Sequence, residues 1–390
     1  MTRPDGGGGR TARDIVLVGN EVDELGGVGR WQILMARLFA ARGHRVTVVG
    51  VAPADSPFGL GEDPPFRTLT LHDTRPAGRR PVRGLRERVD PVARHREAVR
   101  ERGRREAAER LSAVLHAARP GAVVIVTQVW AMEWVALADT AGHTVIGMSH
   151  ESFETSRASS RFARVKRYYK DVDRMLVLTR EDADRWIGEG FNHVGFLPNP
   201  VPLEPGAPSP RTGKVVAGVG RLGYEKGVDL LLDTWAEVSP RHPGWLLRVH
   251  GSGPDEAALR RQCTELGLDG SVEWAGRTED VAGALRRSSV FVLSSRGEGF
   301  PLSLLEAMSC AVPCVAFDCA PGVREIVRHE EDGLLARPGD TAELARHLGR
   351  LLEDADLRNR MGDRAYRNVR RFSAEAVTDR WENLFALLDR

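Results

Sequence analysis

A proline-rich break divides this chain. Six prolines lie within residues 197–211, where no hydrophobic periodicity is visible, and a new strand pattern follows them. Proline fixes φ and lacks a backbone N–H, so neither a helix nor a central strand can run through such a segment. A chain of 390 residues is also longer than one hydrophobic core usually serves. We therefore predict two domains, residues 1–200 and 201–371, followed by a terminal segment, residues 372–390.

Short apolar runs alternate with helical segments on both sides of the break. The runs are IVLVGN, RVTVVGV, AVVIVT, TVIGMS and RMLVLT in the first half, and KVVAGVG, WLLRVHG, SVEWAG, VFVLSS and PCVAFD in the second. Buried strands that alternate with helices are typical of parallel sheets covered by helices on both faces. The predicted fold class is α/β, with two doubly wound, Rossmann-like domains facing each other across a cleft. Ligands of such sheets bind at the carboxyl ends of the strands.

The stretch EGFPLSLLE, Glu298 to Glu306, predicts a binding site at one of these strand ends. It follows the apolar run VFVL, and Pro301 suits the first turn of a helix. The free N–H groups and the positive dipole end of a helix N-terminus suit a phosphate. The two carboxylates are poor phosphate ligands but good acceptors for sugar hydroxyls. A nucleotide sugar offers both kinds of group.

A second loop, GVGRLGYEKG, lies at residues 218–227. It contains the spacing G-x-G-x-x-G of a dinucleotide site, but the next strand ends in RVH without the acidic residue that would hold a ribose, so we reject an NAD site. Arg221 and Lys226 remain, and Lys226 is one of only four lysines in the chain. Paired cations beside a helix N-terminus would neutralise a diphosphate leaving group. The alternative is an ordinary loop with solvated charges.

Taken together, these segments resemble a known family. GRLGYEKG, WLLRVHGSGP, EGFPLSLLEAMSCAVPCVA, and PGVREIV followed by DGLLARPGD occur in the order seen in the nucleotide-binding half of retaining glycosyltransferases of family 4, which have the GT-B fold. GGVGR at residues 26–30 and the segment around His150 resemble that family too. Residues 372–388 resemble its terminal helix, which packs back on the first domain. The chain departs from the family at residues 320–325, where relatives often have Gly-Gly, a proline and a glutamate.

The resemblance implies a role for individual residues. It places Arg221 and Lys226 at the donor diphosphate, Glu298 beside the sugar and phosphates, and His150 near the transferred sugar, and these four form the catalytic set. Donor binding is implied for Gly26, Gly27, Arg277, Gly299, Phe300, Pro301, Leu302, Glu306 and Glu325. Among them Glu306 would hold the ribose hydroxyls, Arg277 would lie near the base, and Glu325 would bind a sugar hydroxyl.

Two basic regions lie in the first half, which would receive the acceptor. Residues 157–170 interleave basic and aromatic side chains, and residues 75–110 are rich in arginine. We single out Arg161, Lys166 and Arg167 as candidates for contact with a polyanionic polymer, a lipid phosphate or a membrane surface. Solvated helix faces are the alternative, which we prefer for residues 75–110. Nucleic acid is not predicted as a partner, because no recognition motif accompanies the charge.

The predicted function is retaining transfer of a hexose or N-acetylhexosamine from a UDP-sugar to a cell-envelope acceptor, such as a teichoic-acid-like polymer or a lipid-linked glycan. No cofactor or metal is predicted, because arginine and lysine can replace a divalent cation. Alternatives are a small-metabolite acceptor, a nucleotide-sugar epimerase or phosphorylase on the same fold, and a non-enzymatic glycan-binding module. The sequence has neither a long apolar run nor a signal-peptide core, which predicts a cytoplasmic protein and leaves peripheral contact with the inner membrane face open. The identity of sugar, nucleotide and acceptor, and the oligomeric state, are not predicted.

Overall fold

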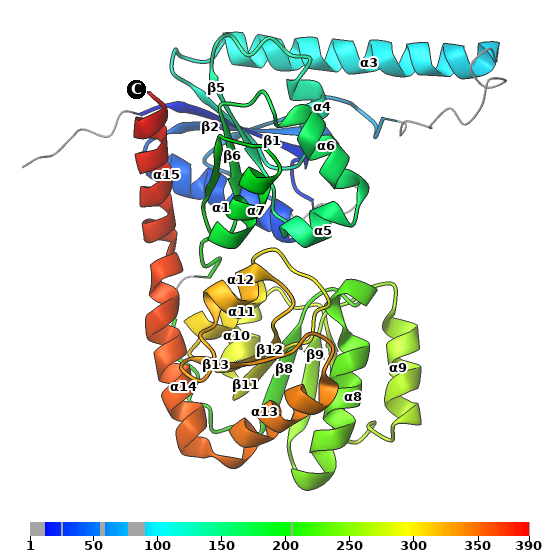
Figure 1. The fold of residues 1–390 in the computed structure, drawn as a ribbon, viewed down its shortest axis with the longest axis vertical. Coiled ribbons are helices and arrows are strands. Elements are labelled where there is room, and N and C mark those ends of the chain that lie inside the picture. Colours follow the sequence, from blue (N-terminus) through cyan, green and yellow to red (C-terminus); the bar gives the residue numbers. More distant parts are fainter. Residues whose placement is uncertain (1–11, 25, 55–58, 77–89, 204–205, 390) are drawn as a thin grey trace, which may run out of the picture.

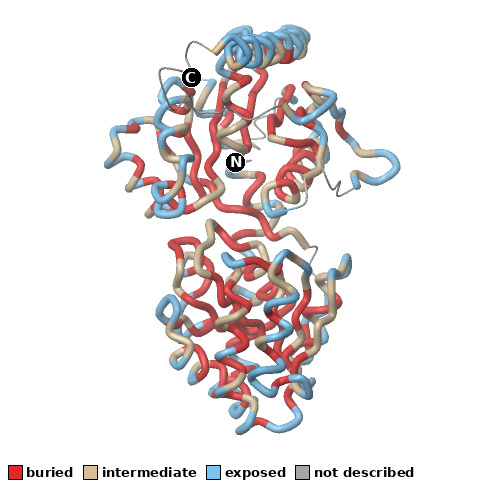
Figure 2. The backbone as a smooth tube through the Cα atoms, turned by 90° about the vertical axis from the view of Figure 1, so that its right-hand side faces the viewer, coloured by how far each residue is buried: buried red, intermediate tan, exposed pale blue. Residues whose placement is uncertain are grey.

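The computed structural model describes residues 12–24, 26–54, 59–76, 90–203 and 206–389. Two α/β domains lie one above the other, and the last helices run along one side of both (Figure 1). The strands of the first domain end at Phe196, and those of the second begin at Val215. Each domain has a buried interior, whereas the long helix at the far end of the first domain is exposed along most of its length (Figure 2).

The first domain contains a parallel sheet with the strand order β3-β2-β1-β4-β5-β6-β7. Its strands are β1 Asp14–Glu21, β2 Arg45–Ala52, β3 Arg67–Thr70, β4 Val123–Val126, β5 Thr144–Met148, β6 Arg174–Val177 and β7 Val194–Phe196. Its helices are α1 Gly27–Ala41, α3 Pro91–His116, α4 Met132–Val135, α5 Phe153–Arg157, α6 Ser160–Tyr168 and α7 Arg180–Gly188. From β1 the chain adds strands toward one edge of the sheet, and from β4 it adds them toward the other edge. The loops that follow β1 and β4 therefore diverge and leave a crevice at this reversal point.

The second domain repeats this plan with the strand order β10-β9-β8-β11-β12-β13. Its strands are β8 Val215–Val219, β9 Leu246–His250, β10 Val272–Gly276, β11 Val290–Leu293, β12 Cys314–Phe317 and β13 Gly333–Ala336. Its helices are α8 Val228–Val238, α9 Glu256–Glu265, α10 Val281–Arg286, α11 Leu302–Ser309, α12 Pro321–Ile326, α13 Thr341–Glu353 and α14 Ala355–Asn368, with the short 3-10 helices η1 Tyr224–Lys226, η2 Ser239–Arg241 and η3 Val369–Phe372. The reversal here lies between β8 and β11, so the two loops singled out from the sequence are neighbours.

The last helix, α15 Ala374–Leu388, returns to the first domain (Figure 1). Its Trp381 ring lies 6.2 Å from the ring of Trp31, and Phe385 lies 5.7 Å from Phe39. Both partners are on α1, and these aromatic rings are almost completely buried. Burying large aromatic rings is strongly stabilising, so α15 fixes the two domains to each other.

Helix α1 begins at Gly27, so the segment GGVGR forms mostly the first turn of this helix. Glycine makes this possible, because a Cβ on Gly29 would lie 1.9 Å from the carbonyl oxygen of Glu24. Gly26, with φ of 151°, occupies a conformation that other residues rarely adopt.

Within the described residues, no helix combines the length and the apolar character needed to cross a bilayer. The same residues contain no group of three or more His, Cys, Asp or Glu side chains placed to hold a metal ion.

Candidate active site

Lys226 and Glu298 are brought together at the carboxyl edge of the second sheet. Lys226 Nζ donates to Glu298 Oε1 over 2.7 Å, and Ser295 Oγ donates to the same oxygen over 2.6 Å. Gly227 allows the two loops to meet, because its φ is 59° and a Cβ there would lie 2.1 Å from the carbonyl oxygen of Ser294. The second carboxylate oxygen of Glu298 therefore remains available to a ligand. The ammonium group of Lys226 can turn from Glu298 toward a bound anion.

Helix α11 points its N-terminus into the same region. Pro301 is the N-cap residue, one position before the first helical turn in which the sequence placed it, and no side chain caps the helix. The first-turn N–H groups of Leu302 and Ser303 therefore receive no acceptor from a capping side chain. Together with Lys226, this helix end favours a negatively charged group.

Arg221 and Arg277 lie exposed at the same sheet edge, after β8 and β10 respectively. In the described part of the chain, neither guanidinium takes part in a hydrogen bond or an ion pair. Both cations are therefore available to a ligand in the crevice.

Glu306 is buried, with 1% of its surface exposed, and it forms an ion pair with Arg30 across the domain boundary. Burial raises the pKa of this carboxyl group, and the positive charge of Arg30 opposes that shift. Arg30 extends from α1 of the first domain, so the carboxylate predicted to hold a ribose also links the two domains. A ribose would have to share Glu306 with Arg30 or displace it.

The domains also touch at Gly299. A Cβ at this position would lie 1.9 Å from the backbone oxygen of His150, at the end of β5. The His150 ring packs edge-on against Trp31 at 4.7 Å, and its Nε2 atom is buried without a hydrogen-bond partner. Burial lowers the pKa of His150 to about 3, so the imidazole is neutral at physiological pH. A neutral imidazole with a free nitrogen can exchange a hydrogen bond with a sugar hydroxyl.

A cavity of about 410 Å³ lies beside His150 in the first domain. It occupies the reversal point of the sheet, because residues after β1, β4 and β5 line it. Two more of its polar atoms, Asn20 Oδ1 and Ser156 Oγ, are buried without a hydrogen-bond partner. Buried polar atoms normally have hydrogen-bond partners in proteins, so these three atoms make the cavity suited to a polar ligand.

Three arginines, Arg75, Arg161 and Arg164, form the positive wall of this cavity, and Arg75 is paired with the buried Glu21. Arg161 pairs with Glu151 at 2.8 Å, and burial raises the pKa of that carboxyl group against the effect of Arg161. Trp130 adds an aromatic surface of the kind on which sugar rings pack. The cavity thus combines groups for hydroxyls, for a ring face and for negative charge.

Comparisons with known proteins bear on both domains. Residues 204–368 match the sequence model of the family described as Glycosyl transferases group 1. Exopolysaccharide phosphotransferase SCO2592 of Streptomyces coelicolor is 38% identical over 222 residues, which are 56% of this chain and 24% of that protein. An uncharacterized glycosyltransferase of Haemophilus influenzae is 32% identical over 215 residues, which are 54% of this chain and 61% of that protein. This chain thus covers less than two thirds of either relative.

The structural comparison covers nearly the whole chain. The crystal structure of HepE from Anabaena in complex with UDP-glucose aligns with a TM-score of 0.74 and 17% identity, over 95% of this chain and 99% of that one. The fold is GT-B. The family match lies in the second domain, whereas the GT-B fold extends over nearly the whole chain.

The cavity of the first domain is lined by one of the three predicted acceptor residues. Arg161 lines the cavity beside His150. Lys166 instead donates to Glu189 over 2.8 Å, and Arg167 lies over the ring of Tyr168 at 5.1 Å. Lys166 and Arg167 do not line this cavity, and their contact with an acceptor stays a prediction.

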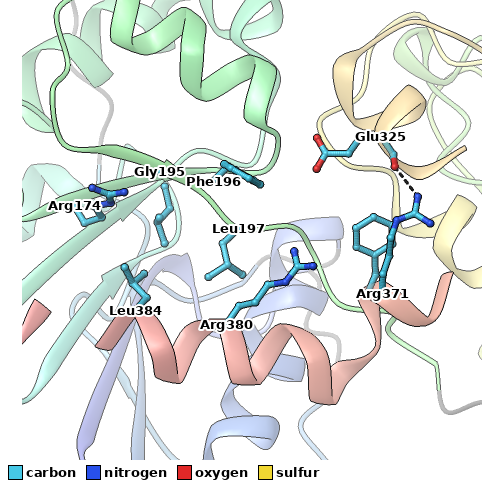
Figure 3. Close-up of a pocket in the computed structure, with 10 residues that line it drawn as sticks. Arg174, Gly195, Phe196, Leu197, Glu325, Arg371, Arg380 and Leu384 are labelled. Carbon is cyan, nitrogen blue, oxygen red and sulfur yellow. Dashed lines mark hydrogen bonds between the residues drawn. The ribbon is translucent and has the colours of Figure 1, made fainter. Parts of the chain in front are cut away.

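Glu325 is the predicted donor residue that lies apart. Its carboxylate accepts the backbone N–H of Arg180, the first residue of α7, and its side chain lines a different cavity (Figure 3). Helix α12 is turned so that Gly322 meets the cleft instead, where a Cβ would lie 1.9 Å from the oxygen of Gly299. The role of Glu325 as a sugar ligand stays a prediction.

Several site residues were missed from the sequence. Arg30 stands inside the quoted motif GGVGR, yet nothing local shows that it reaches the second domain. Asn20 and Trp130 could have been found, because they end or follow strands β1 and β4, on either side of the reversal point of the sheet. Arg164 was not missed in the same sense, because it belongs to the basic segment 157–170 and lies one helical turn from Arg161.

Proposed function

We propose that this protein is a retaining glycosyltransferase that uses a UDP-linked hexose or N-acetylhexosamine and acts on an anionic or lipid-linked glycan of the cell envelope. The observation that carries the proposal is the meeting of Lys226, Glu298 and the uncapped N-terminus of α11, opposite His150 of the other domain. The neighbour HepE, crystallised with UDP-glucose, supports the choice of donor. The exopolysaccharide phosphotransferase of Streptomyces coelicolor supports an envelope acceptor.

The donor diphosphate would lie at the N-terminus of α11. Lys226, Arg221 and the first N–H groups of the helix would contact its oxygens, with the ribose on Glu306 and the base near Arg277. These donors stabilise the negative charge that develops on the diphosphate as the glycosidic bond breaks, which lowers the barrier. Because two side-chain cations do this work, we propose that transfer requires no divalent metal and no cofactor.

The sugar would lie between Glu298 and His150. The acceptor hydroxyl attacks the anomeric carbon on the face that the diphosphate leaves, and its proton passes to a diphosphate oxygen. The new glycosidic bond then has the configuration of the old one, and no enzyme carboxylate becomes a nucleophile. Glu298 and the neutral His150 orient the sugar through its hydroxyls.

The acceptor would enter the cavity of the first domain. Arg161 and Arg164 favour an acceptor with phosphate or carboxylate groups, while Trp130 and Asn20 suit its sugar rings and hydroxyls. The same positive wall lies on a domain that could rest against an anionic membrane surface, and we propose such peripheral contact at the inner face for lipid-linked acceptors.

The first experiment is a thermal-shift screen of UDP-, GDP- and ADP-sugars, followed by transfer assays with the stabilising donor. A ligand that binds only the folded protein raises its melting temperature. We expect a UDP-sugar to give the largest shift, and the product of transfer to keep the anomeric configuration of the donor by NMR. Interconversion of the sugar without any acceptor would instead indicate an epimerase, and an inverted product would refute the retaining mechanism.

A further inference from the structure

A second large cavity lies away from the proposed reaction site. Its volume is about 470 Å³, and Figure 3 shows it between edge strand β7, helix α15 and helix α12. The lining includes Gly195, Phe196 and Leu197, where the chain leaves the first domain. Of the residues predicted for the donor site, it contains only Glu325.

The charged side chains of this cavity are Arg174, Arg371, Arg380 and Glu325. Arg174 Nε is buried without a hydrogen-bond partner. Arg380 makes no hydrogen bond or ion pair with any residue that the structure describes. Buried N–H groups normally have a hydrogen-bond acceptor, and this one has none. The cavity therefore offers more hydrogen-bond donors than acceptors.

Arg371 is held by neutral groups. Its guanidinium donates to the backbone oxygens of Glu325, Ile326 and Asn368, as well as to the side chain of Asn368. Burial lowers the pKa of Arg371, the neighbouring cations Arg328 and Arg380 act in the same direction, and the carboxylates of Asp332 and Glu325 oppose this shift. Three guanidinium groups thus share a cavity with one carboxylate, and a bound anion would relieve their repulsion.

We propose that this cavity binds a small anion with two or more negative charges, such as pyrophosphate or a doubly phosphorylated sugar. Arg174 and Arg371 stand at opposite ends of the cavity in Figure 3, with Arg380 between them. Two linked phosphate groups would pair with Arg174 and Arg380 through charge-assisted hydrogen bonds. The terminal N–H groups of Arg371 already donate to other acceptors, so Arg371 would add only the attraction of its charge.

An anion bound in this cavity would affect the position of the two domains relative to each other. Arg174 belongs to β6 of the first domain, Arg380 to α15, and Glu325 to α12 of the second domain. An anion that contacts several of these elements stabilises the arrangement in which they converge. The site is therefore placed to couple the level of a phosphorylated compound to the position of the two domains.

The test uses pyrophosphate as the probe and isothermal titration as the measurement. The starting protein carries Arg221→Ala and Lys226→Ala, which removes the proposed diphosphate contacts of the donor site. We expect this variant to bind pyrophosphate at one site and inorganic phosphate at least tenfold more weakly. Adding Arg380→Glu should weaken pyrophosphate binding at least tenfold. The matched control is Arg360→Glu, an exposed arginine of α14, which should leave the affinity unchanged.

The outcomes separate clearly. Undetectable pyrophosphate binding in the starting variant, unchanged affinity after Arg380→Glu, or an equal loss with Arg360→Glu overturns the proposal. If Arg380→Glu lowers the melting temperature, Arg380→Gln replaces it, with a several-fold loss expected. The thermal shift of wild-type protein with UDP is measured in parallel and should survive Arg380→Glu, so a failure here is distinct from a failure of the proposed enzyme activity.

Discussion

Replacing Gly299 by alanine should force the two domains apart. The new Cβ would lie 1.9 Å from the backbone oxygen of His150, whereas real Cβ contacts stay above 3.0 Å. The clash requires a displacement of at least 3.0 − 1.9 = 1.1 Å. The loop that carries Gly299 is held on both sides, because Glu298 pairs with Lys226 and the Phe300 oxygen accepts a hydrogen bond from Asn199. Relief must therefore come from movement between the domains.

A displacement of about 1 Å in a reacting geometry costs on the order of 100-fold in rate. We expect Gly299→Ala to lower kcat for sugar transfer by about that factor. The free energy of unfolding should fall by no more than about 1–3 kcal/mol, the usual cost of overpacking. Initial rates at saturating donor and acceptor, with urea denaturation alongside, measure both quantities.

The matched control lies two residues away. A Cβ on Gly297 would meet Thr155 Oγ1 of the first domain at 3.5 Å, an ordinary contact. Gly297→Ala should therefore keep a rate close to that of the wild type. If Gly299→Ala retains more than half of the wild-type rate, sugar transfer does not require the close domain contact at Gly299, and the reasoning is refuted.

Four further predictions follow from the site. Lys226→Ala should lower kcat by about 10²–10³-fold, as loss of a charge-stabilising donor does; a rate within tenfold of wild type would contradict its role. Glu306→Gln should weaken UDP binding roughly tenfold or more in a titration, because the amide offers one acceptor oxygen where the carboxylate offers two, and unchanged affinity would remove the ribose contact. Arg164→Glu should lower kcat/KM for an anionic acceptor at least tenfold with the donor KM unchanged, while Lys166→Glu on the same helix should change neither; equal effects would show that only overall charge matters. Burial holds the pKa of His150 at about 3 in the folded protein, against about 6.5 in the unfolded chain. Between pH 6.5 and about 3 the His150 side chain is protonated in the unfolded chain and neutral in the folded protein. The free energy of unfolding therefore falls as the pH is lowered through this range, by about 2 kcal/mol at pH 5. His150→Asn should therefore lose less stability than wild type between pH 7.5 and 5 in urea denaturation, and equal losses would contradict the assignment.

Much of the second domain was predictable because its signals are local. The strand pattern before Glu298, the proline at 301 and the glycine loop before Lys226 each specify a segment of about ten residues. The rule that strand ends share one edge of a parallel sheet then brings Lys226 and Glu298 together, although they are 72 residues apart.

Contacts between the domains were not predictable in this way. Arg30 and Glu306 are 276 residues apart and belong to different sheets, so their meeting depends on how the domains face each other. No periodicity in the sequence encodes that orientation. Glu325 shows the same limit, because the turn of α12 toward Arg180 is decided by packing across the boundary rather than by the motif.

Residues 157–170 illustrate a different limit. The sequence marks them as one basic segment, and helix α6 distributes their charge around its axis. Arg161 and Arg164, one turn apart, face the cavity, and Lys166 points to Glu189 on another side. The helical period would have separated these side chains if it had been applied to the charges.

The most direct test of the account is a crystal structure of the protein with UDP. We expect the diphosphate within hydrogen-bonding distance of Lys226 and the first N–H groups of α11, and the ribose hydroxyls on Glu306 with Arg30 moved or shared. A structure grown at saturating UDP in which Lys226 still contacts only Glu298, and the nucleotide is absent from this crevice or bound elsewhere, would contradict the account.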